Sequence, residues 1–377
     1  MKLMSFRRPD GMPSWGIAKN EGVIDLGHLA PSLKHALWAT ASLAEQAARK
    51  PDHRLADIRF LPPIPDPDKI FCVGLNYVTH IKEGGREAPK KPIIFTRTPS
   101  SQVGHNESVI RPKASETFDY EGELAVVIGA RCRHVPRAQA KDVIAGFSCY
   151  NEGSVREFQR HTAQFTPGKN FWRSGAFGPW IVTPDEMGDV SRQTLMTRLN
   201  GKEVQHATID DLLFDVPALI EYCSTFTELL PGDVIVTGTT GGVGAYHTPP
   251  LWMKPGDTVE VEISGPRHPA KQGRRRGVML FVIPANRRVR EFANRSQRHP
   301  RASGDPGGSE EGQRCGPGSP EFTNEVQHQA KVLQWPDITR TSILRTAARL
   351  PAFMKAGNRC AKSRQLWIAR HRRFLAS

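Results

Sequence analysis

The feature that most limits how this chain can fold is a series of short runs rich in β-branched and aromatic residues between residues 69 and 264. Gly, Pro and Asp separate the runs, as they do at turns between strands. Short helices, such as those expected at 136–146 and 215–226, lie between the runs. Many strands with few long helices predict an α+β, mainly β fold, a mixed β-roll or β-sandwich rather than a doubly wound sheet. The strand-like runs are KIFCVGLN (69–76), PIIFTR (92–97), GELAVVIG (122–129), PWIVT (179–183), DVIVTGT (233–239) and TVEVEIS (258–264).

The first 65 residues predict a small α+β domain of their own. GIAKNEGVID (16–25) places a turn between two short extended pieces, and residues 33–49 carry apolar residues at helical spacing with many Ala. The proline-rich stretch LPPIPDPDK (61–69) predicts an extended connector. We therefore expect a boundary near residue 65, followed by a larger domain over 66–264.

Charge divides the chain at residue 264. Residues 1–264 carry 29 Lys and Arg against 31 Asp and Glu, whereas the remaining 113 residues carry 23 against 7. The near-neutral part has no general attraction for nucleic acid or acidic membranes. Residues 265–377, with Gly/Ser/Pro-rich stretches such as 301–322, predict a basic and poorly ordered extension. A nucleic-acid-binding protein would need basic charge among aromatics on the folded part; deleting 266–377 should therefore abolish any DNA binding.

Cysteine usage and apolar runs predict a cytoplasmic protein. The six cysteines form no CxxC pair, and a chain of 377 residues does not need disulfides for stability. The opening MKLMSFRRPDG lacks the apolar core of a signal peptide. No run of about 18 apolar residues occurs, so no membrane span is expected.

The segment DYEGELAVVIG (119–129) places two acids one residue apart. On a strand, Glu121 and Glu123 point to the same face as Ala125 and Val127. Carboxylates beside apolar residues repel one another and resist burial. A divalent cation such as Mg²⁺, Mn²⁺ or Ca²⁺ relieves both effects, because it prefers oxygen ligands. The same pair also fits a solvated strand face.

A polar segment, GFSCYNEGSVREFQRHTAQFTPGKNF (146–171), supplies further candidates. Glu152 is a candidate third carboxylate, and Arg156 or Lys169 can bind a substrate carboxylate or enolate. The alternative is an amphipathic helix in which Glu152 pairs with Arg156 at i,i+4.

Two more segments carry candidate groups. In CVGLNYVTHIKEGG (72–85), His80 and Glu83 share one helical face, and a carboxylate can orient an imidazole as a general base. An ordinary surface helix fits the same spacing. In LPGDVIVTGTTGGVG (230–244), the hydroxyls of Thr239 and Thr240 can meet an anion. This loop lacks the Lys of a P-loop, which argues against nucleotide binding.

Together and in this order, the four segments resemble the fumarylacetoacetate hydrolase family, most clearly from Lys69 to Ile263. The resemblance implies a fumarylacetoacetase-type β-roll core in which an ExE strand and a third acid hold a metal. The third acid is usually Asp and is Glu152 here. The residues that the resemblance assigns are Glu121, Glu123 and Glu152 for the metal, His80, Glu83 and Lys169 for catalysis, and Arg156, Gln159 and Thr239 or Thr240 for the substrate.

The resemblance also implies an activity. It points to a Mg²⁺-dependent (or Mn²⁺- or Ca²⁺-dependent) homodimeric enzyme that hydrolyses C–C bonds or isomerises small 2-oxo or enol carboxylic acids. These reactions share a metal-stabilised enolate and belong to the catabolism of aromatic compounds or sugar acids. An oxaloacetate-type decarboxylase and a catalytically inactive, metal-free member are the alternatives. Metal analysis of the purified protein separates the inactive member from the enzymes.

One departure from the family lies at the end of the matching region. Where the family has a GIGxLxNPV-like ending, this chain has EISGPRHPAKQGRRR (262–276). The abrupt change in charge and composition predicts an altered reading frame or a fused extension beyond this point.

Overall fold

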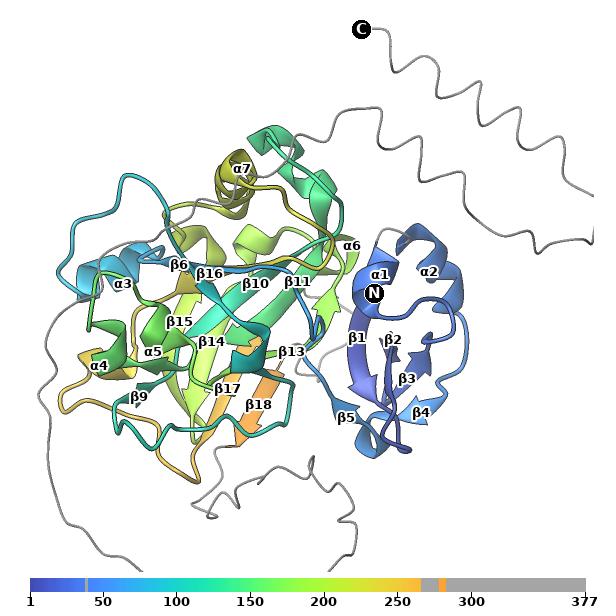
Figure 1. Ribbon diagram of the computed structural model, residues 1–377, viewed down its shortest axis with the longest axis horizontal. Coiled ribbons are helices and arrows are strands. Elements are labelled where there is room, and N and C mark those ends of the chain that lie inside the picture. Colours follow the sequence, from blue (N-terminus) through green and yellow to red (C-terminus); the bar gives the residue numbers. More distant parts are fainter. Residues whose placement is uncertain (38–39, 266–277, 283–377) are drawn as a thin grey trace, which may run out of the picture. The chain divides into compact units, whose positions relative to one another are not determined.

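The computed structural model describes residues 1–37, 40–265 and 278–282. These residues form mainly β structure with short helices (Figure 1), as the sequence predicts. Apart from residues 265 and 278–282, the predicted basic extension lies outside the described residues. None of the helices in the described parts has the length and apolar character that a membrane crossing requires.

A 12-stranded sheet forms the larger layer, with the order β4-β3-β2-β1-β13-β11-β10-β16-β6-β7. β5 pairs with β1, and β8 pairs with β13. Neighbours are antiparallel except for β16 with β6 and β13 with β8. The strands of this sheet are β1 (Lys2–Arg7), β2 (Pro13–Lys19), β3 (Gly22–Asp25), β4 (His53–Arg54), β5 (Arg59–Phe60), β6 (Ile70–Gly74), β7 (Ile93–Arg97), β8 (Gln102–Val103), β10 (Gly122–Ile128), β11 (Ile144–Asn151), β13 (Gly175–Val182) and β16 (Val234–Thr239).

A second, four-stranded antiparallel sheet has the order β15-β14-β17-β18. Its strands are β14 (Thr194–Leu199), β15 (Lys202–Thr208), β17 (Thr258–Ile263) and β18 (Val278–Val282). Alternate residues of β14 and β17 are buried, as on a strand that faces a core on one side only. β14 and β17 contact β10 and β11, so one apolar core lies between the two sheets.

β10 is buried on both of its faces, which explains why its sequence is almost entirely apolar. Leu124 and Val126 belong to the core between the sheets, whereas Ala125 and Val127 belong to a second core on the opposite face. A charged residue on this strand is therefore removed from water whichever way it points. A short two-stranded sheet, β9 (Phe118–Asp119) with β12 (Ser154–Val155), lies just before β10 and just after β11 in the chain.

The first 60 residues extend the large sheet. β2 and β3 form the predicted hairpin, with Asn20 at a positive φ of 54° in its turn. β1 pairs with β13 in the register Leu3 to Ile181, so these strands are continuous with those of the 66–264 region. The helix predicted over 33–49 corresponds to two short helices, α1 (Leu33–Ala36) and α2 (Thr40–Gln46).

The remaining helices are short, and several of them contribute residues to the site. They are α3 (Val78–Glu83), α4 (Arg156–Gln159), α5 (Thr166–Lys169), α6 (Pro184–Met187) and α7 (Val216–Phe226), with a 3-10 helix η7 (Gly244–Tyr246). α7 confirms the helix predicted at 215–226, whereas the one predicted at 136–146 is a 3-10 helix over Arg137–Val143. The alternative of an amphipathic helix through 146–171 is wrong, because β11 occupies residues 144–151 with neighbours on both sides.

The start of α7 offers a simple stability test. The Asp215 carboxylate accepts a hydrogen bond from the Ala218 N–H at 3.0 Å and so satisfies one of the free donors of the first turn. Asp215→Ala should lower the free energy of unfolding by about 1 kcal/mol in urea titrations. Asp215→Asn keeps an acceptor and should cost much less; equal losses for the two variants would contradict the capping role.

Candidate active site

Three buried carboxylates meet where β10 and β11 run side by side. Glu123 lies in β10, Glu121 directly precedes that strand, and Glu152 directly follows β11. The Glu152 N–H donates to the Glu121 carbonyl oxygen at 2.8 Å, which continues the pairing of the two strands. One carboxylate oxygen from each residue lies within 4.8 Å of the others. All three side chains are buried, so the alternative of a solvated strand face is wrong.

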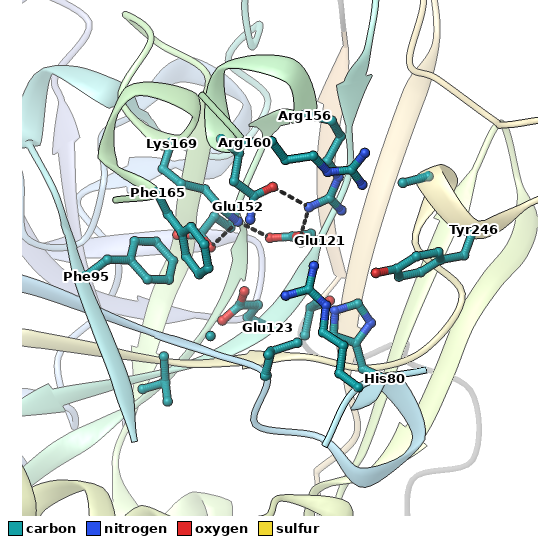
Figure 2. A pocket seen from close by; sticks show the side chains of 17 residues that line it. His80, Phe95, Glu121, Glu123, Glu152, Arg156, Arg160, Phe165, Lys169 and Tyr246 are labelled. Atoms are coloured by element: carbon teal, nitrogen blue, oxygen red, sulfur yellow. Dashed lines mark hydrogen bonds and ion pairs between the residues drawn. The ribbon is translucent and has the colours of Figure 1, made fainter. Parts of the chain in front are cut away.

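Two buried cations neutralise part of this cluster. Lys169, the last residue of α5, places its Nζ 2.5 Å from Glu121 Oε2 and 2.8 Å from Glu152 Oε2. Arg156, the first residue of α4, places Nη1 2.6 Å from Glu121 Oε1. Dashed lines in Figure 2 mark these contacts. Glu121 is thus held by both of these cations, and Glu152 by Lys169.

The sequence reasoning missed a fourth buried acid, Asp119. Its Oδ2 lies 2.7 Å from both Nε and Nη2 of Arg156. The N–H groups of Gly244 and Ala245 donate to the same carboxylate at 2.8 and 3.0 Å. Asp119 therefore fixes the Arg156 guanidinium and ties it to η7. The strand alternation that marked Glu121 and Glu123 includes this position as well, and that signal could have found it.

Glu123 differs from its neighbours because no cation pairs with it among the described residues. It accepts the Gly238 N–H at 2.6 Å. Burial raises the pKa of Glu123, and the carboxylates of Glu152 and Glu121 raise it further. For Glu121 burial acts in the same direction, but Arg156 and Lys169 outweigh it and hold the pKa well below its usual range.

The buried acids at this site outnumber the buried cations. Asp119 and the three glutamates supply four buried carboxylates, while Arg156, Lys169 and Arg97 supply three buried cations. Arg97 lies behind the cluster, with Nη1 3.8 Å from Glu152 Oε1, and donates to the Gly153 carbonyl oxygen at 3.2 Å.

One negative charge therefore remains unmatched among the described residues. Glu152 Oε1 is also buried without a hydrogen-bond partner in this part of the chain. An unmatched charge and a free oxygen in an all-oxygen cluster fit a Mg²⁺, Mn²⁺ or Ca²⁺ ion.

The cluster opens into a cavity of about 70 Å³. Figure 2 shows the acids at its base, with His80 and Tyr246 on one side and Phe95 and Phe165 on another. A cavity needs roughly 10–15 Å³ to hold one water molecule, so this cavity suits a small ligand. Its lining residues are Val73, Gly74, Leu75, His80, Arg86, Phe95, Glu121, Glu123, Glu152, Arg156, Gln159, Arg160, Phe165, Lys169, Thr239, Ala245 and Tyr246.

The predicted histidine lies in this cavity rather than on a surface helix. His80, on α3, is 8% exposed, and its Nδ1 lies 3.4 Å from Glu83 Oε2. The other Glu83 oxygen, Oε1, accepts the Gly242 N–H at 2.9 Å. The carboxylate is thus fixed by the Gly-rich loop and faces the imidazole, which is the arrangement that orients a general base.

The remaining predicted residues occupy different places. Gln159 lines the cavity and accepts from Arg156 Nη1 at 2.9 Å. Thr239 lines it too, while its hydroxyl donates to the Gly122 carbonyl oxygen at 2.9 Å. Thr240 is buried, and its carbonyl oxygen accepts from Gln205 at 3.0 Å. Within the described residues the cavity lining includes Thr239 and not Thr240.

Comparisons with known proteins agree on one family. Residues 69–276 match the family model described as "Fumarylacetoacetate (FAA) hydrolase C-terminal". The chain is 38% identical over 277 residues to the human "Oxaloacetate tautomerase FAHD2A, mitochondrial", covering 70% of this chain and 88% of that protein.

Solved structures show the same likeness. A putative HpcE protein from Mycobacterium smegmatis is 32% identical, with a TM-score of 0.66 over 76% of this chain and 99% of that one. Maleylpyruvate hydrolase from Sphingobium sp. SYK-6, solved in complex with manganese(II) and pyruvate, is 25% identical, with a TM-score of 0.61 over 76% of this chain and 100% of that one.

Proposed function

Because this chain belongs to the fumarylacetoacetate hydrolase family, we propose that it is a divalent-metal-dependent enzyme that interconverts the keto and enol forms of small 2-oxo carboxylic acids. The observation that carries this proposal is the unmatched carboxylate charge of Glu123 in a cavity that also contains His80. The curated relative is named an oxaloacetate tautomerase, which favours isomerisation among the reactions of the family.

The reaction removes a proton from C3 of the substrate and leaves negative charge on the C2 oxygen. A divalent cation held by Glu121, Glu123 and Glu152 would supply a Lewis acid for that oxygen. His80 can take the C3 proton, because a proton on Nδ1 that faces Glu83 leaves Nε2 as a free acceptor. Return of the proton to oxygen completes the enol with no change in the number of atoms.

In this scheme Lys169 and Arg156 hold the acidic side chains in place through ion pairs. Burial would lower the pKa of Lys169, but Glu121 and Glu152 raise it, so the ammonium stays charged between them. The two cations leave Glu123 as the charge that attracts a metal and keep the other carboxylates fixed.

Hydrolysis of a C–C bond is the second candidate. It is favoured by the likeness to maleylpyruvate hydrolase and by the position of His80, which can activate water instead of taking a carbon-bound proton. An acylpyruvate would then be cleaved to a carboxylic acid and pyruvate. Oxaloacetate-type decarboxylation is the remaining alternative and releases CO₂.

One set of measurements separates these reactions. The protein loaded with Mg²⁺ or Mn²⁺ is mixed in D₂O with oxaloacetate or acetylpyruvate, and deuterium at C3, pyruvate and CO₂ are followed. We expect C3 exchange well above the metal-only rate with little cleavage. Cleavage that keeps pace with exchange would favour the hydrolase or decarboxylase, and a protein that takes up no divalent metal would contradict the enzyme proposal.

Glu83 provides a test of the general base. Glu83→Gln removes the carboxylate charge that faces His80 Nδ1 and orients the imidazole. A general base contributes roughly 10²–10⁴ to a rate, so partial loss of its orientation should lower kcat roughly tenfold, with metal affinity unchanged. Stopped-flow exchange kinetics and calorimetric Mn²⁺ titration measure the two quantities; a loss of metal affinity instead would place Glu83 with the acid cluster.

The proposed oligomeric state comes from the family resemblance, and the proposed location comes from the cysteine usage. We propose a homodimer and a cytoplasmic protein whose partner is its small-molecule acid. Light scattering of the purified protein tests the first, and fractionation of the source cells tests the second; the human relative is named as mitochondrial.

A further inference from the structure

Two arginines that line the cavity belong to no ion pair of the described residues. Arg86 follows α3, and Arg160 follows α4. Both side chains are exposed, in contrast to the buried cations at the base of the cavity. Figure 2 shows Arg160 on the same side of the cavity as Arg156, which lies four residues earlier in the chain. The sequence reasoning named neither Arg86 nor Arg160.

The cations that the sequence assigned to the substrate are already engaged by acids of the chain. Lys169 lies between Glu121 and Glu152, and Arg156 lies between Asp119 and Glu121. Neither has a positive charge left over for a ligand. An anionic group that enters the cavity therefore finds uncompensated positive charge only at Arg86 and Arg160 among the described arginines and lysines of the lining.

The backbones that carry the two arginines are held in place. The Arg86 N–H donates to the Ile81 carbonyl oxygen at 3.1 Å, and the Arg160 N–H donates to the Glu157 carbonyl oxygen at 3.1 Å. Each arginine is thus fixed to the end of a helix that also carries His80 or Arg156. A guanidinium presents paired donors that match a carboxylate in a bidentate geometry.

We propose that Arg86 and Arg160 bind a second, distal carboxylate, so that the preferred substrate is a 2-oxo dicarboxylic acid. This inference rests on the proposed function, because it places the 2-oxo end of the substrate at the acid cluster. The small cavity leaves room for a short carbon chain between the two ends, beside Phe95 and Phe165. A 2-oxo monocarboxylic acid leaves both guanidiniums without a partner.

The test compares pairs of acids that differ by one carboxylate. Arg86→Gln, Arg160→Gln and the double variant are compared with Arg133→Gln, which removes the same charge from an exposed arginine away from the cavity. Deuterium exchange at C3 is measured for oxaloacetate and for 2-oxobutyrate. Binding of L-malate and of 2-hydroxybutyrate to the Mn²⁺-loaded protein is measured by calorimetry, which needs no turnover.

We expect the unaltered protein and Arg133→Gln to favour the dicarboxylate in both assays. Each cavity variant should lower kcat/KM for oxaloacetate roughly tenfold, and the double variant roughly a hundredfold, mainly through KM, as for a lost charge-assisted hydrogen bond. Values for 2-oxobutyrate and 2-hydroxybutyrate should change less than about twofold.

Two results would overturn parts of this scheme separately. If exchange occurs but the two acids of each pair behave alike in every variant, the distal carboxylate site is wrong while the proposed function stands. If neither oxaloacetate nor 2-oxobutyrate exchanges and no Mn²⁺ binds, the proposed function itself fails.

Discussion

Glu123→Gln should abolish divalent-metal binding and activity while making the metal-free protein more stable. The substitution keeps the shape of the side chain and an acceptor for the Gly238 N–H, but it removes the unmatched buried charge. Loss of a direct ligand should weaken Mn²⁺ binding by more than the roughly 10–100-fold that outer-shell changes cost. Loss of several kcal/mol of Lewis-acid stabilisation lowers the exchange rate by about 10³-fold or more.

The stabilisation of the metal-free variant follows from the pKa of Glu123. A carboxyl group whose pKa is raised on folding stabilises the protein fully below its unfolded pKa and loses that contribution as pH rises through the folded pKa. Gln does not titrate, so the variant should be more stable than the unaltered protein at pH 7, and the gain should shrink as the pH is lowered toward 4.5. Urea titrations in chelator at both pH values measure the difference; a variant less stable at pH 7 would contradict the unmatched charge.

Lys169→Met should have the opposite effect on the metal-free protein. It leaves Glu121 and Glu152 buried with one cation fewer, and breaking a buried pair costs about 3–5 kcal/mol. We expect the loss to be largest in chelator and partly reversed by Mn²⁺, because the metal replaces some of the missing positive charge. Thermal unfolding with chelator and with saturating Mn²⁺ gives both values.

The two substitutions form a double-mutant cycle. Because both residues act through the charge of one cluster, Glu123→Gln should raise the free energy of unfolding more in the Lys169→Met background than on its own. Lys169→Arg serves as the matched control, since it retains the positive charge with a different shape. Additive effects of the two substitutions, or equal losses for Lys169→Met and Lys169→Arg, would show that packing and not charge sets the stability of the cluster.

Strands with alternating polar and apolar residues, or with β-branched runs, were predictable from the sequence. A strand of small and polar residues was not. All six predicted runs contain strands of the structure, from β6 to β17. β11 was missed because its residues, IAGFSCYN, mix small and polar side chains. Its strand conformation comes from pairing with β10 on one side and β13 on the other. Tertiary context of this kind overrides local preference.

The same division applies to the site. The spacing of Glu121 and Glu123 placed them together because strand geometry fixes neighbours two residues apart. Arg97 could not be identified from the sequence, because its role depends on which segments pack against it. The solvated alternatives for the acids and for His80 failed because the sequence shows only polar side chains, whereas the fold shows that these side chains are buried.

Because β10 pairs with β11, the acids that would bind the metal are held separately from the residues that would set substrate preference. The acids that would hold the ion are attached to adjacent central strands, whereas Arg86, Arg160 and Tyr246 are carried by short segments at the ends of α3, α4 and η7. Those segments can vary in length and composition without shifting the strand ladder. A designer who wants a new substrate preference can therefore exchange the residues that follow α3 and α4 and leave the acids on β10 and β11 in place.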